Sequence, residues 1–251
     1  MEVVLSWWRP RRSGLIPFAD ALEAVGDEGA MGTYDDEVPL SQVMGSVSRS
    51  DDFDDDFRPR RRTDRFQAVL DRFRSGSIPP AVSLVRLGQM YFVVDGHHRV
   101  AAARAQGWTH IAAHVRRICS VAYVCSCITV ADLPAKAAER RFLEEVPLPE
   151  DIRRGLWLDR PADWARLADS ALAWEFRQQR DRRGRADVDA HGLASAWWLE
   201  EVAPTVSRIR ADAPTDLVDV QLYITELARR DGVADLSWPS PHCCPDHTPP
   251  P

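Results

Sequence analysis

The 251-residue sequence lacks three features that mark broad classes of protein. No apolar run approaches the ~18 residues of a membrane-spanning helix, so we expect no membrane partner. Basic residues are not in excess: 32 Lys and Arg against 38 Asp and Glu give a net charge of −6, which excludes nonspecific binding of nucleic acid by the whole molecule. The five cysteines lack the paired Cys-x2-Cys spacing of a zinc site, so we expect reduced thiols and no metal.

Lysine is almost absent, because Lys136 stands alone among the 32 basic residues. With the abundant alanine, this is typical of codon bias in a GC-rich genome, and we attach no function to it. The N-terminal apolar stretch, residues 3–8, is too short for a secretory signal and has its arginines on the wrong side, which predicts a cytoplasmic protein. Met1 and Met31 are both candidate starts of translation.

The rest of the chain divides into four segments. Residues 1–37 show no sustained period and contain Gly26, Gly29 and Gly32, so we expect a poorly ordered lead-in. Residues 38–145 mix strand-like and helix-like patterns, which predicts an α+β domain with a small mixed sheet. Residues 146–235 carry helical periodicity alone and predict an all-helical domain. Six prolines after residue 236 predict a disordered tail over residues 236–251.

Several elements of the α+β domain are recognisable. Residues 38–43 indicate a short edge strand or a turn, because Pro39 cannot donate a ladder hydrogen bond to a central strand. Hydrophobic spacing predicts a helix after Thr63 and a β-hairpin around Gly88-Gln89. The other elements expected here are, in chain order, a helix over 100–106, strands over 111–115 and 121–128, and a helix over 129–145 that opens on a capping box.

The strongest chemical signal is Asp95-Gly96-His97-His98-Arg99, where a strand is followed by one glycine and a helix. Unpaired N–H groups and the helix dipole favour an anion such as phosphate at this position. Arg99 offers a planar fork of donors to phosphate oxygens, and the two histidines can move protons near neutral pH. The alternative is a satisfied helix N-terminus, with Asp95 as the cap and Arg99 paired with an acid elsewhere in the chain.

A second signal is the acidic run at residues 51–56, followed at once by four arginines within residues 58–62. The simpler interpretation is a solvated loop in which the opposite charges neutralise each other. The alternative is a loop beside an active site. In that case Asp54 or Asp55 would bind Mg²⁺ or deprotonate an acceptor, with His97 as a further catalytic residue.

The stretch Asp95-Gly-His-His-Arg-Val-Ala-Ala-Ala resembles the signature turn of the ParB/sulfiredoxin superfamily. In that superfamily the turn holds CTP in partition proteins, ATP in sulfiredoxins and a nucleotide in free-serine kinases. Gly96 and Arg99 match all three versions, His98 matches the sulfiredoxin turn, and Asp95 and His97 match the kinase turn. The resemblance covers roughly residues 38–118. It implies that Asp95, Gly96, His97, His98 and Arg99 bind a nucleoside triphosphate, CTP or ATP, with Mg²⁺ as a candidate companion ion.

Two departures from the superfamily limit what the resemblance implies. His97 stands where sulfiredoxins carry their nucleophilic cysteine, so sulfinic-acid reduction is not expected. In ParB proteins a DNA-reading helix-turn-helix follows this domain, whereas the helices after residue 146 are rich in tryptophan and acid, so DNA binding stays open. The whole pattern resembles a group of actinobacterial ParB-like proteins with this turn and a helical C-terminal half.

We therefore expect a nucleotide-binding module of regulatory or partition type, whose tryptophan-rich half forms a core or a homodimer face. The alternative is an enzyme of the same fold, either a nucleotide-dependent phosphotransferase of small molecules or a nucleotide hydrolase, with a nuclease ranked third. Catalysis requires that a carboxylate from residues 51–56 lie close to the turn. Under both hypotheses Arg99 is expected to contact phosphate.

Overall fold

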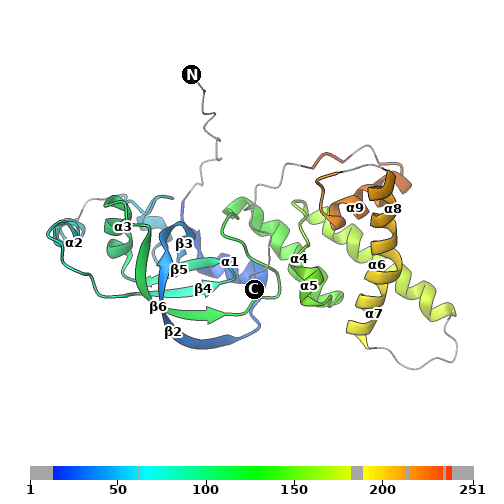
Figure 1. The fold of residues 1–251 in the computed structure, drawn as a ribbon, viewed down its shortest axis with the longest axis horizontal. Helices are drawn as coiled ribbons and strands as arrows, with labels where there is room; N and C mark the ends of the chain where they lie inside the picture. The colour runs from blue at the N-terminus through cyan, green and yellow to red at the C-terminus, as the bar shows by residue number, and fades with distance from the viewer. Residues whose placement is uncertain (1–13, 62, 182–188, 213–214, 234–235, 239–251) are drawn as a thin grey trace, which may run out of the picture. The chain divides into compact units, whose positions relative to one another are not determined.

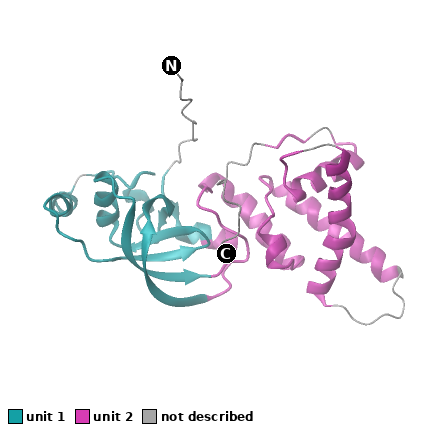
Figure 2. Ribbon diagram, viewed as in Figure 1, with its two compact units in different colours: residues 1–21, 30–118 teal, residues 22–29, 119–251 magenta. Residues whose placement is uncertain are grey.

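The chain folds into two compact units, one built around a sheet and the other helical (Figures 1 and 2). Unit 1 comprises Met1–Ala21 and Ala30–Ile118, and unit 2 comprises Leu22–Gly29 and Cys119–Pro251. This mixed architecture confirms the predicted fold class. The computed structural model describes residues 14–61, 63–181, 189–212, 215–233 and 236–238.

Unit 1 contains a six-stranded mixed sheet in the order β1-β3-β5-β4-β6-β2. The predicted hairpin is β4 and β5, which pair antiparallel. β3 runs parallel to β5, β4 runs parallel to β6, and β2 lies antiparallel to β6 at the edge. The strands are β1 Ile16–Pro17, β2 Ala30–Pro39, β3 Val43–Ser46, β4 Val82–Leu87, β5 Met90–Asp95 and β6 His110–Ile118.

Two helices cover one face of this sheet, α2 (Asp64–Arg74) and α3 (His97–Ala105) (Figure 1). Thr63 caps α2 as predicted, because its side chain accepts a hydrogen bond from the Phe66 N–H. Alanines at 101–103 keep α3 slim, so its axis can lie close to the strands. The shared core includes Leu70, Phe73, Val82, Leu84, Val93, Val100 and Val115.

The prediction of a poorly ordered lead-in over residues 1–37 is wrong from residue 14 onward. β1, the helix α1 (Phe18–Val25) and most of β2 lie in this segment, so a chain starting at Met31 would lack β1 and α1. Residues 38–39 of β2 fall in the predicted edge strand, but the rest of β2 escaped detection because an edge strand with both faces exposed shows no alternation of apolar and polar residues. Residues 1–13 lie outside the described residues.

The predicted domain boundary after residue 145 lies instead after Ile118. The helix α4 (Leu133–Glu145) belongs to unit 2, because Phe142 and Leu143 are part of that unit's core. A short 3-10 turn that Thr129 caps precedes α4, which confirms the capping box. The predicted strand over 121–128 is wrong, because this segment buries apolar side chains without pairing to a strand. A short apolar run does not distinguish a buried strand from a buried irregular segment.

Unit 2 is a set of helices around tryptophan and tyrosine side chains. The predicted tryptophan-rich core is confirmed, since Trp164, Trp174, Trp197 and Tyr223 are all buried. The prediction of a disordered tail is wrong for residues 236–238, because Trp238 donates a hydrogen bond to Thr225 Oγ1; residues 239–251 lie outside the described residues. Besides α4 the helices are α5 Glu150–Arg153, α6 Pro161–Asp181, α7 Ala190–Trp197, α8 Ala203–Asp212 and α9 Asp219–Arg230.

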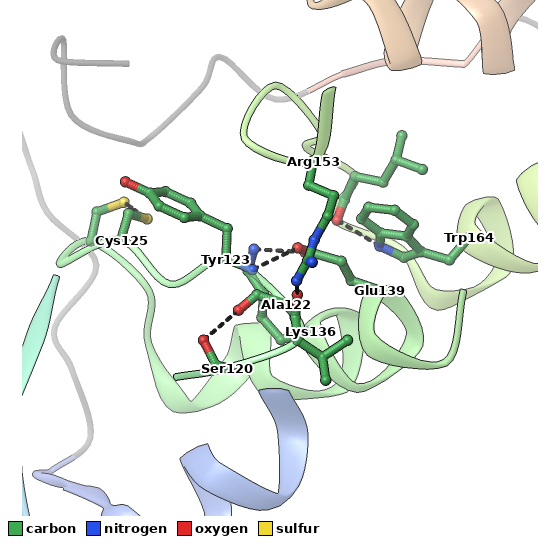
Figure 3. Close-up of polar contacts among 11 residues, drawn as sticks. Ser120, Ala122, Tyr123, Cys125, Lys136, Glu139, Arg153 and Trp164 are labelled. Carbon is green, nitrogen blue, oxygen red and sulfur yellow. Dashed lines mark hydrogen bonds and ion pairs between the residues drawn. The ribbon is translucent and has the colours of Figure 1, made fainter. Parts of the chain in front are cut away.

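The single lysine of the chain is buried in unit 2 (Figure 3). Lys136 Nζ lies 2.7 Å from Glu139 Oε2 and 4.9 Å from the centre of the Trp157 ring. The other carboxylate oxygen of Glu139 accepts a hydrogen bond from the Tyr123 N–H, so the pair holds the irregular segment 119–128 against α4. Burial raises the pKa of the Glu139 carboxyl, and the Lys136 ammonium opposes that shift.

No helix in the described ranges is long and apolar enough to cross a bilayer.

Candidate functional site

The predicted turn forms as expected, with β5 ending at Asp95 and α3 beginning at His97. Gly96 has φ of +97°, a left-handed backbone conformation that residues with a Cβ atom rarely adopt. A Cβ on Gly96 would also lie 2.6 Å from Val82 Cγ1. The backbone conformation and the contact with β4 therefore account for the glycine without a ligand.

Arg99 is held by three groups of its own unit. Its Nη1 donates to the carbonyl oxygens of Pro80 and Ala81 at 2.8 and 2.6 Å, and its Nη2 donates to Asp95 Oδ2 at 2.7 Å. The Arg99 side chain is only 19% exposed. The N-cap of α3 is Gly96, without a side-chain capping hydrogen bond, so Asp95 is the partner of Arg99 and not the cap that the alternative above expected. Arg99 ties the segment before β4 to α3, and its fork does not point into an open pocket.

His97 links the turn to β3. Its Nε2 lies 2.7 Å from Ser46 Oγ, and that oxygen accepts hydrogen bonds from the N–H groups of Ser48 and Arg49. Burial, followed by the charge of Arg49, lowers the pKa of His97 to about 4, so the ring is neutral at pH 7. Because Ser46 and His97 are 1% and 4% exposed, this serine–histidine pair is sealed from solvent and acts as a structural tie.

His98 lies one residue further along and is only partly buried. Its ring lies between those of Phe53 and Phe66, with centroid distances of 5.6 and 5.9 Å. Burial, and then the charges of Arg49 and Arg65, lower its pKa. Its Nδ1 is buried and has no hydrogen-bond partner among the described residues. Of the five residues predicted in the turn, His98 is the one that reaches a pocket.

That pocket has a volume of about 490 Å³. Three arginines and two aspartates leave it one net positive charge when His98 is neutral. It also adjoins the start of α2, where N–H groups and the helix dipole favour an anion. The lining residues are Arg49, Asp51, Asp52, Phe53, Pro59, Arg60, Arg61, Thr63 and His98.

The charged run that lines the pocket is a packed loop. Phe53 and Phe57 within it are fully buried, and Phe53 stacks on His97 at a centroid distance of 5.6 Å. The Arg60 N–H donates to the Asp52 carbonyl at 2.9 Å, and Arg60 Nε donates to the Phe53 carbonyl at 3.2 Å. The two phenylalanines therefore bring part of the acidic run and the arginines that follow it beside the turn.

The structure does not place the predicted catalytic aspartates in the pocket. Asp54 Oδ1 accepts hydrogen bonds from the N–H groups of Asp56 and Arg58, so it shapes its own loop. Asp55 is absent from the pocket lining, whereas Asp51 and Asp52 contribute to it. In the ranges that the structure describes, no group of three or more His, Cys, Asp or Glu is arranged to hold a metal ion.

Sequence reasoning missed the three pocket arginines and the location of Thr63. Arg60 and Arg61 belong to the block whose charge was expected to neutralise the acidic run, and Arg49 precedes that run. The available signal was the alternation of aromatic and charged residues in the run. Two phenylalanines among five aspartates predict a loop that is anchored at the core.

No family model matches the chain, and no curated protein matches it. Among solved structures the chain is similar to sulfiredoxin from Arabidopsis thaliana, with 16% identity over 34% of this chain and 88% of that one and a TM-score of 0.28. It is also similar to a Pnob8-like ParB-N domain, with 11% identity over 80% of this chain and 82% of that one and a TM-score of 0.25. At these identities and TM-scores they carry no argument about sites or ligands.

Proposed function

We propose that unit 1 is a binding module that holds the phosphates of a nucleotide in the pocket beside His98. The observation that carries the proposal is the convergence of Arg49, Arg60 and Arg61 with the start of α2 on one cavity of about 490 Å³. This volume falls in the range of small-ligand pockets, roughly 300–1,000 Å³. Guanidinium groups match phosphate oxygens in geometry as well as in charge.

His98 supports the proposal as a hydrogen-bonding group at the pocket. Because the pKa of His98 is lowered, the positive charge of the pocket at neutral pH comes from the arginines. His98 Nδ1 is buried and has no hydrogen-bond partner among the described residues, which is uncommon for a buried polar atom. Binding of a phosphate near His98 would counter the lowering of its pKa, so we expect affinity to rise as the pH falls below neutral.

A specific observation also keeps the enzyme alternative. Asp51 and Asp52 line the same pocket as the arginines, so carboxylates from the acidic run do lie beside the turn. Two carboxylates together with phosphate oxygens and water are a common set of Mg²⁺ ligands, and Mg²⁺ would neutralise phosphate charge during phosphoryl transfer or hydrolysis. The binding module is favoured because Asp52 is paired with Arg49 at 2.7 Å and His97 is sealed from solvent.

A thermal-shift screen with CTP, ATP, ADP and GTP, each with and without Mg²⁺, tests the proposal. A ligand at 100 times its Kd stabilises the folded state by about 2.7 kcal/mol, which is readily measured. Arg61→Gln should abolish the shift. Arg58→Gln is the matched control, because Arg58 is 76% exposed, belongs to the same arginine block and does not line the pocket. A shift that both variants retain, or no shift with any nucleotide, would contradict the proposal. Phosphate release in the same samples would favour the enzyme.

A further inference from the structure

One cation of the pocket already has an anionic partner. Arg49 Nε lies 2.7 Å from Asp52 Oδ2, and both side chains line the pocket. The two side chains are 39% and 54% exposed, so an incoming anion can reach either of them. The Arg49 guanidinium also lies 5.5 Å from the centre of the Phe53 ring, which restricts where it can move.

The local backbone presets this pair. Residues 50–52 form a 3-10 turn, which places residues 49 and 52 on the same side. The Arg49 N–H donates to Ser46 Oγ at 2.8 Å, so its position depends on the buried tie to His97. The Asp52 carbonyl is fixed by the Arg60 N–H. The contact between Arg49 and Asp52 therefore persists without any ligand.

We propose that Asp52 is a built-in competitor that occupies Arg49 until an anion of higher charge displaces it. This inference rests on the proposed function of the same pocket. A ligand must exceed the attraction of one carboxylate for Arg49, and phosphate groups of higher charge do so more readily than monoanions. The pair would thus select polyphosphate chains over single phosphates and small monovalent anions.

Asp51 provides a matched control. It lines the same pocket and carries the same charge, but within the described part of the chain it forms no ion pair or hydrogen bond. Removal of either carboxylate makes the pocket more positive by one charge. Only Asp52→Asn also frees Arg49, so a larger effect of that variant isolates the competition from the general change in charge.

Isothermal titration calorimetry with inorganic triphosphate in EDTA tests the inference on the full chain. We expect Asp52→Asn to raise affinity about three- to ten-fold, and Asp51→Asn to raise it less than two-fold. In an Arg49→Gln background, Asp52→Asn should lose its additional effect over Asp51→Asn, because the partner is gone. Circular dichroism confirms that each variant is folded, which the exposure of both aspartates favours.

The outcomes separate this inference from the proposed function. If the unchanged protein binds triphosphate and Asp52→Asn binds it equally or more weakly, the competitor role is overturned but the proposed binding pocket is not. An Asp52→Asn variant that gains no affinity in EDTA and binds more weakly in a parallel titration with Mg²⁺ also overturns it and identifies Asp52 as a metal ligand. If neither the unchanged protein nor Asp52→Asn binds triphosphate, the proposed function itself is overturned. Binding by Asp52→Asn alone supports both.

Discussion

Arg99→Ala is expected to destabilise unit 1 while leaving anion affinity nearly unchanged. The guanidinium of Arg99 donates to two backbone carbonyls, those of Pro80 and Ala81, and forms an ion pair with Asp95. These contacts join the segment before β4 to the first turn of α3. None of them involves a group that lines the pocket beside His98.

The size of the effect follows from these three contacts. A hydrogen bond contributes about 1 kcal/mol net, so loss of the two carbonyl contacts costs about 2 kcal/mol. Asp95 is 70% exposed, so its ion pair with Arg99 adds less than about 1 kcal/mol. We therefore expect the free energy of unfolding of unit 1 to fall by about 2–3 kcal/mol.

Urea denaturation followed by circular dichroism measures the loss, with the transitions of the two units fitted separately. Arg99→Lys is the control, because it retains the charge without the planar fork and should lose an intermediate amount. Triphosphate affinity of each folded variant is measured by calorimetry. An Arg99→Ala protein of unchanged stability whose affinity falls ten-fold or more would refute this reasoning and restore Arg99 as a phosphate ligand.

Three further perturbations test the fold and the turn. Lys136→Met leaves the Glu139 carboxyl buried without its partner and should lower the free energy of unfolding by about 3–5 kcal/mol in urea denaturation. The double variant Lys136→Met with Glu139→Leu should lose much less stability. Equal losses in the two variants would contradict this. Gly96→Ala should lower the free energy of unfolding by more than about 2 kcal/mol, measured by thermal denaturation. Gly107 also has positive φ but lies in open space, so Gly107→Ala should lower it by about 1 kcal/mol. Similar losses would argue against the close packing of Gly96. Because the pKa of His97 is lowered from 6.5 to about 4, its contribution to stability is complete above pH 6.5 and is lost as the pH falls toward 4, by at most about 3 kcal/mol. A pH series of unfolding should therefore be shallower for His97→Gln, and parallel curves would contradict the assignment.

The sequence was most informative where an element has one buried face. The stripe on α2 and the hairpin of β4 and β5 were recognised because their burial follows the period of the element. Most of β2 was missed because an exposed edge strand has no such period. The segment 121–128 was assigned as a strand from its apolar residues. Apolar residues of this segment are buried, but the segment pairs with no strand.

The candidate site was predicted in place but not in its chemistry. Asp95-Gly96-His97-His98-Arg99 is the correct strand-turn-helix junction, since it depends on local signals. The partners of Arg99 could not be assigned from the sequence, because two of them are backbone carbonyls that the fold brings to it. The pocket arginines lie nearly 40 or more residues upstream of the turn, and the packing of Phe53 and Phe57 places them there.

The location of the anion site is tested most directly by hydrogen–deuterium exchange with and without inorganic triphosphate. We expect slower exchange of the backbone amides in residues 46–61 and at the start of α3, because ligand contacts stabilise the loop against the turn. Exchange in unit 2 should not change. Protection confined to residues 79–82, or no protection in unit 1 at saturating triphosphate, would contradict an anion site beside His98.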